Sequence, residues 1–163
     1  MPKIFHFDSP REHYHCDAAV VWCFDQRFEL VLRKLLKRNG IEHPDHIRVA
    51  GGAKCLASPD PEGEREFVLS QIRKSARLHG TDRVLLMVHS DCGAYGGLGA
   101  FGGDAEAEAR HHRDELRLAA ACLKDSVPEV SAVCYYVDFE GVWTTDPSGA
   151  LETATPGYVA ANR

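Results

Sequence analysis

The sequence lacks the features that mark several large classes of protein. Its 163 residues carry a net charge of −5, so the basic surface that binds nucleic acid or anionic lipid is not predicted. No apolar run approaches the roughly 20 residues that a membrane helix needs. The segment Met1 to Asp8 has neither the basic nor the apolar part of a signal peptide. We therefore expect a cytoplasmic protein without a nucleic-acid or membrane partner.

Cysteine is too scarce and too scattered for a fold held together by disulfides. The chain is long enough to bury a core without cross-links, and cytoplasmic thiols stay reduced. Cysteines at special positions are then better interpreted as ligands or nucleophiles, and the others as small core residues. The six are Cys16, Cys23, Cys55, Cys92, Cys122 and Cys134. The core interpretation is favoured for Cys55, Cys122 and Cys134, which lie in apolar or helical surroundings.

Short apolar runs that alternate with helical stripes predict an α/β fold of three layers, with a mostly parallel central sheet and helices on both faces. Strands are expected over Ala18–Phe24, His46–Ala50, Arg83–Val88 and Ser131–Asp138, with Val142–Thr145 beside the last. Helices are expected over Asp25–Asn39, Glu64–His79 and Ala105–Lys124. The whole chain, 1–163, is expected to be a single domain with an arm over 1–17, a core over 18–146 and a tail over 147–163. That tail is expected to be loosely held or used at an interface.

Chemically reactive residues stand at the ends of two of these strands. Cys23 ends the first strand, whereas His89 and Cys92 end the third. If the two strands are neighbours, the three side chains converge at the carboxyl edge of the sheet, where such folds bind ligands. Two thiolates and an imidazole suit Zn²⁺, and three protein ligands leave one tetrahedral position open, as in catalytic sites. The alternative for Cys23 is a small buried core residue.

Asp25 and Arg27 follow Cys23 closely and belong to the same prediction. A carboxylate here can bind the metal in its open position or accept a hydrogen bond from metal-bound water. An ion pair with Arg27 would hold Asp25 away from the metal and keep the open position free. The alternative is that Asp25 only caps the helix that begins after Phe24.

Three segments resemble motifs of the β-class carbonic anhydrases: Cys23-Phe-Asp25-Gln-Arg27, Arg48-Val-Ala-Gly51-Gly52 and His89-Ser-Asp-Cys92-Gly93. The family patterns are C-x-D-S-R, R-N-A-G and H-x-x-C-G, and the resemblance covers roughly Ala18 to Asp138.

This resemblance implies a zinc lyase, usually a homodimer or a higher homo-oligomer, that interconverts CO₂ and bicarbonate through zinc-bound hydroxide. It also implies that Cys23, His89 and Cys92 are the zinc ligands and that Asp25 and Arg27 form the catalytic dyad.

Other functions stay open beside CO₂ hydration. Gln26 and Val49 stand where the family patterns have serine and asparagine, and only a short segment precedes Ala18. A zinc-binding relative that is inactive on CO₂, acting as a sensor or binding module, is one alternative. Another uses the same zinc hydroxide on a different small electrophile, such as carbonyl sulfide or carbon disulfide. The selectivity among small gases depends on pocket shape, which the sequence does not define.

Three further patterns are interpreted without a new chemical role. Gly97-Leu-Gly99-Ala-Phe-Gly102 matches the dinucleotide fingerprint, but several residues separate it from Val88, whereas a true fingerprint starts directly after its strand. We expect its glycines to shape a flexible loop at the mouth of the metal site. His13-Tyr-His15-Cys16 and His111-His112 could each form a second metal cluster, and we expect both to be surface residues instead.

Overall fold

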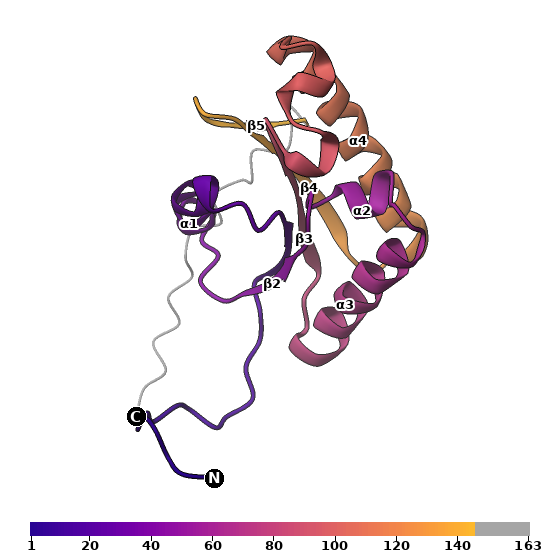
Figure 1. Ribbon diagram of the computed structural model, residues 1–163. Helices are drawn as coiled ribbons and strands as arrows, with labels where there is room; N and C mark the ends of the chain where they lie inside the picture. Colours follow the sequence, from indigo (N-terminus) through magenta and orange to yellow (C-terminus); the bar gives the residue numbers. More distant parts are fainter. Residues whose placement is uncertain (146–163) are drawn as a thin grey trace.

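A five-stranded sheet forms the centre of the computed structural model, which describes residues 1–145 (Figure 1). Its strand order is β2-β1-β3-β4-β5. The strands are β1 (Ala18–Trp22), β2 (Pro44–Arg48), β3 (Arg83–His89), β4 (Ser131–Val137) and β5 (Val142–Thr144). The first four are parallel, and β5 pairs antiparallel to β4. The predicted mostly parallel sheet is confirmed; the predicted tail over 147–163 lies outside the described residues.

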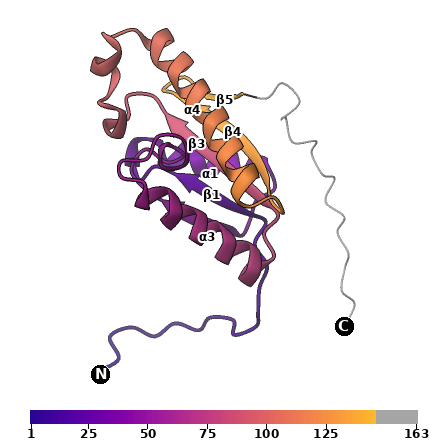
Figure 2. The same cartoon turned by 90° about the vertical axis from the view of Figure 1, so that its right-hand side faces the viewer.

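Helices cover both faces of the sheet. Figures 1 and 2 show α1 (Glu29–Arg38) on one face and α2 (Lys54–Ala57), α3 (Gly63–His79) and α4 (Ala105–Ser126) on the other. Short 3-10 turns are η1 (Gln26–Phe28), η2 (Gly93–Tyr95) and η3 (Leu98–Phe101). Helix α2 was not predicted, because a single turn is too short to carry a periodic apolar pattern. Among residues 1–145, no helix is both long and apolar enough to cross a bilayer.

The sequence of β1 is nearly continuously apolar because the strand is buried on both faces. Ala19 and Val21 point into the core beneath α2, α3 and α4, whereas Val20 and Trp22 point into the core beneath α1. All five residues of β1 are inaccessible to solvent. None of the six cysteines, which all lie within residues 1–145, forms a disulfide. Cys55 and Cys134 are buried core residues as predicted, and Cys122 is partly buried against the same core.

The strand order has a switch point at the ends of β1 and β3. From β1 the chain crosses to β2 on one side, and it later returns to add β3 on the other side of β1. At such a switch in strand order the loops leave in opposite directions, and ligands of parallel sheets bind there. Cys23 directly follows β1, and His89 is the last residue of β3.

Candidate metal centre

Cys23, His89 and Cys92 come together at this switch point. Their ligand atoms all lie within 4.8 Å of one another. The expectation that their strands are neighbours is confirmed, since β1 pairs with β3 in parallel. Exposure is 4% for Cys23, 0% for His89 and 2% for Cys92. Two thiols and an imidazole that meet in a buried position are a suitable set of ligands for Zn²⁺.

The hydrogen bonding of the His89 imidazole leaves its Nε2 available as a metal ligand. Its Nδ1 lies 2.8 Å from the carbonyl oxygen of Ser90. A carbonyl can only accept, so Nδ1 carries the hydrogen and Nε2 of the neutral ring has a free lone pair. That Nε2 is buried and has no hydrogen-bond partner in the described part of the chain. A buried nitrogen without a partner is costly, and a metal ion would satisfy it.

The contact between the two thiols shifts their pKa values in opposite directions. A hydrogen bond with Cys92 lowers the pKa of Cys23 to about 4, outweighing the opposing effect of burial. The same contact and burial raise the pKa of Cys92. The contact between the two thiols therefore favours the thiolate of Cys23, and a cation would favour deprotonation of the second thiol.

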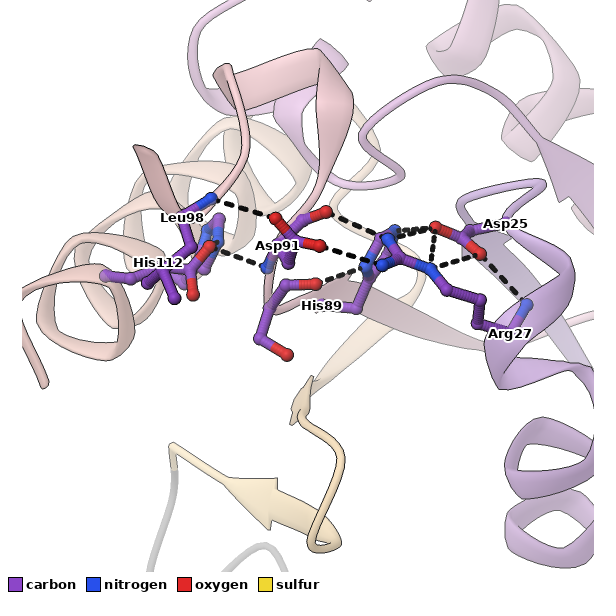
Figure 3. Close-up of polar contacts among 8 residues, drawn as sticks. Asp25, Arg27, His89, Asp91, Leu98 and His112 are labelled. Atoms are coloured by element: carbon purple, nitrogen blue, oxygen red, sulfur yellow. Dashed lines mark hydrogen bonds and ion pairs between the residues drawn. The ribbon is translucent and has the colours of Figure 1, made fainter. Parts of the chain in front are cut away.

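Asp25 lies beside the cluster and is held by Arg27. The guanidinium donates through Nε and Nη2 to Asp25 Oδ2 over 3.0 and 2.7 Å (Figure 3). These hydrogen bonds lower the pKa of Asp25, so its carboxylate stays charged. Asp25 Oδ2 lies 3.9 Å from His89 Nε2. Asp25 also accepts from the backbone N–H of Arg27 at 2.9 Å, so the alternative of a capping role holds together with the ion pair.

Asp91 is a partner of Arg27 that sequence reasoning missed. Arg27 Nη1 donates to Asp91 Oδ2 over 2.8 Å, and Nη2 donates to the Asp91 carbonyl over 2.9 Å. Figure 3 shows the guanidinium between the two aspartates. Asp91 has a φ of 51°, a left-handed conformation that is uncommon outside glycine and favours Asp and Asn. Its place between His89 and Cys92 was the available signal.

A buried acidic residue supports Asp91 from helix α4. Glu108, which is 1% exposed, accepts the backbone N–H of Asp91 over 2.7 Å. Burial raises the pKa of this carboxyl. Helical spacing places Glu108, His112 and Leu116 on one side of α4, and all three are buried. That spacing was the signal that could have identified Glu108.

The prediction that His111 and His112 are both surface residues is wrong for His112. Its side chain is fully buried, with its ring centroid 4.5 Å from that of Tyr95. Burial lowers the pKa of His112 to about 3, so the ring is neutral. His111 is exposed as expected. The two rings diverge because successive helical residues point about 100° apart.

The glycine-rich loop lies next to the candidate centre, as expected from its position in the sequence. The backbone N–H of Leu98 donates to Asp91 Oδ1 over 3.0 Å. The dinucleotide interpretation gains no support, because the start of α4 is already capped by Asp104. Its carboxylate accepts hydrogen bonds from the backbone N–H groups of Glu106 and Ala107. A phosphate bound at the start of the helix would need these same N–H groups.

Comparisons with known proteins agree with this architecture. A family model described as "Putative carbonic anhydrase" matches residues 13–145. The fold is similar to a carbonic anhydrase from Streptococcus mutans, with 18% identity, a TM-score of 0.57, and coverage of 86% of this chain and 89% of that one. A β-carbonic anhydrase from Trichomonas vaginalis gives 12% identity, a TM-score of 0.55, and 86% and 87% coverage. An apo carbon disulfide hydrolase gives 13% identity, a TM-score of 0.53, and 93% and 90% coverage.

Proposed function

Because this chain belongs to the carbonic anhydrase-related family matched over residues 13–145, we propose that it catalyses the reversible hydration of CO₂ to bicarbonate with one Zn²⁺. Cys23, His89 and Cys92 would hold the ion, and Asp25 and Arg27 would serve the reaction. The observation that carries the proposal is the buried Nε2 of His89, which lacks a hydrogen-bond partner and lies beside two thiols. When bound, zinc would supply a Lewis acid that lowers the pKa of a water molecule toward neutrality.

Asp25 would orient the attacking water. Its carboxylate is charged and lies beside the ligand nitrogen of His89. It can accept a hydrogen bond from the water and so direct an oxygen lone pair at the carbon of CO₂. The hydrogen bonds from Arg27 restrict the carboxylate to one orientation.

Aromatic residues would form the apolar side of the substrate site. The rings of Phe28 and Trp22 lie 4.8 and 5.5 Å from the ring of His89, and Phe139 lies 5.1 Å from Phe28. CO₂ carries no charge, so an apolar wall suits the substrate. The charged groups of Asp25 and Arg27 lie beside this wall, where the bicarbonate product would form.

Metal removal provides the direct test of this function. The zinc content and the CO₂ hydration rate of purified protein are measured before chelation, after chelation and after zinc is restored. We expect hydration well above background only in the two zinc-containing samples, with the rate following zinc content. An alkaline assay is suitable, because two thiolates keep the pKa of bound water above the value of about 7 known for histidine-only sites. Zinc-loaded protein without hydration would end the CO₂ proposal and favour another small electrophile.

Replacing Asp25 with asparagine is expected to retain zinc and lower turnover about 10- to 100-fold, the usual effect of losing a residue that orients groups around a metal. Asparagine keeps the shape and can still accept the Arg27 N–H, but it lacks the charge that orients water. Glu29→Gln is the matched control. Glu29 lies four residues after Asp25 and forms its own ion pair, with Arg48 at 2.7 Å. Turnover equal to that of the parent would remove Asp25 from the mechanism.

We also propose that the protein works as a homo-oligomer. Large apolar side chains are exposed at both ends of the described chain: Ile4, Phe5 and Phe7 in the arm, and Phe139 and Trp143 near β5. Exposed apolar groups of this size are typical of association surfaces.

A further inference from the structure

A second cluster of side chains of metal-ligand type lies at the opposite end of the strands, near the starts of β1 and β2. Cys16 precedes β1 by two residues, Asp45 lies at the start of β2, and His79 ends α3. Figure 1 shows this lower end of α3 at the opposite end of the strands from the start of α4, on the same face of the sheet. The expectation that Cys16 belongs to a surface group with His13 and His15 is wrong, because Cys16 is only 8% exposed and faces His79.

The donor atoms of this cluster converge on one point. His79 Nδ1 lies 3.8 Å from Cys16 Sγ and 2.7 Å from Asp45 Oδ2. All three donor atoms lie within 4.8 Å of one another. His79 and Asp45 are each 23% exposed, which leaves the cluster accessible to an ion from solvent.

The backbone and neighbouring side chains fix this arrangement. The N–H of Cys16 donates to the carbonyl of His79 over 3.0 Å, which holds the arm against the end of α3. The buried hydroxyl of Ser75 donates to Asp45 Oδ2 over 2.6 Å and orients the carboxylate. The ring of Tyr14 lies 4.5 Å from that of His79.

A cysteine, a histidine and an aspartate could also suggest a nucleophilic triad, but the geometry opposes it. In a triad one ring nitrogen serves the nucleophile and the other serves the carboxylate. Here the same nitrogen, His79 Nδ1, faces both the thiol and the carboxylate. Three donors that meet at one point instead of forming a chain are the pattern of metal coordination.

We propose that Cys16, Asp45 and His79 form a second site for a divalent cation of the zinc type. Thiolate, imidazole and carboxylate are all Zn²⁺ ligands, and their mixture suits a borderline-soft ion. The site would link the N-terminal arm to β2 and α3, so its role is structural and separate from the Cys23 centre.

Binding of a cation would require the Cys16 thiol to lose its proton. Burial and the neighbouring carboxylate of Asp45 raise the pKa of Cys16 to about 11, so the thiol is protonated when no cation is present. Asp45 stays charged, because hydrogen bonds from Ser75 and His79 outweigh its burial and lower its pKa. A cation would take the place of the Cys16 proton, and the charged carboxylate of Asp45 would neutralise part of its charge.

Counting bound zinc in single variants tests the site. The full-length protein is saturated with Zn²⁺, freed of excess by gel filtration and analysed for zinc per folded chain, with circular dichroism to confirm folding. We expect two ions in the parent and one each in Cys16→Ser, Asp45→Asn and Cys92→Ser. Asp45→Asn is the sharper change, since asparagine can keep the Ser75 hydrogen bond. Cys122→Ser, a thiol outside both clusters, should keep two.

The variants also separate the two centres and exclude binding by other histidines. His6, His13 and His15 remain in every variant, so loss of one ion in Asp45→Asn cannot come from the arm alone. If Cys92→Ser keeps one ion that Cys92→Ser/Asp45→Asn loses, the second site stands whatever the Cys23 centre does. A parent with one ion that Cys16→Ser and Asp45→Asn both retain would overturn the proposal.

Discussion

Replacing Cys92 with serine is expected to abolish zinc binding at the Cys23 centre and to lower CO₂ hydration at least about 100-fold, because a metal supplies several kcal/mol of transition-state stabilisation and each 1.4 kcal/mol is about tenfold in rate. A serine hydroxyl stays protonated near neutral pH and is a poor zinc ligand. Only Cys23 and His89 would then remain at the centre, and the 2% exposure of Cys92 leaves little room for water to take its place.

Cys122→Ser is the matched control for this substitution. Cys122 is a partly buried thiol on α4 that packs against the core and belongs to neither cluster. Hydration rate and zinc content, measured in parallel, should match the parent in this control. If Cys92→Ser retained the parent rate, Cys92 would not be a ligand and the proposed centre would be wrong.

Replacing Gly52 with alanine is expected to destabilise the fold by about 2–5 kcal/mol, as the sum of about 1–2 kcal/mol for a left-handed conformation and about 1–3 kcal/mol for overpacking. Gly52 has a φ of 58°, and a Cβ there would overlap the carbonyl oxygen of Met87. It would also lie 3.1 Å from the backbone nitrogen of Cys23. The loop of Gly52, or the neighbouring ends of β1 and β3, would have to shift.

Gly40→Ala separates the two contributions. Gly40 has a φ of 65°, but an added Cβ there meets nothing within 4 Å. Its cost should therefore be only the conformational part, about 1–2 kcal/mol. Denaturant unfolding of both variants gives the comparison, and equal losses of stability would show that Gly52 is not required for close packing.

Much of the fold could be predicted, because buried parallel strands have distinctive sequences. β1 and the residues between Arg83 and His89 in β3 are apolar without interruption, since both faces of each strand are covered. Element ends were less well predicted: the first helix was expected from Asp25 and begins at Glu29. The side chain of Asp25 accepts the Arg27 N–H and starts a separate 3-10 turn. Such local competition for backbone groups does not alter apolar periodicity.

The residues around the candidate centre also divide into those that the sequence could predict and those that it could not. Cys23, His89 and Cys92 could be inferred from strand ends, because strand order alone brings the ends of neighbouring parallel strands together. Glu108 and the cluster of Cys16, Asp45 and His79 could not. Their contacts depend on how α4 and α3 pack on the sheet, which no spacing along the chain specifies. Asp45 and His79 are 34 residues apart, and Cys16 and His79 are 63 apart.

Arg27 is hydrogen-bonded to both Asp25 and Asp91, and this restricts how the protein can vary during evolution. One planar guanidinium joins loops 64 residues apart in sequence, and it meets both a side chain and a carbonyl of the second loop. A lysine carries its charge at a single point and could not reproduce these directions. A change in either loop is therefore transmitted to the other, and relatives with an altered pocket should differ in both loops together.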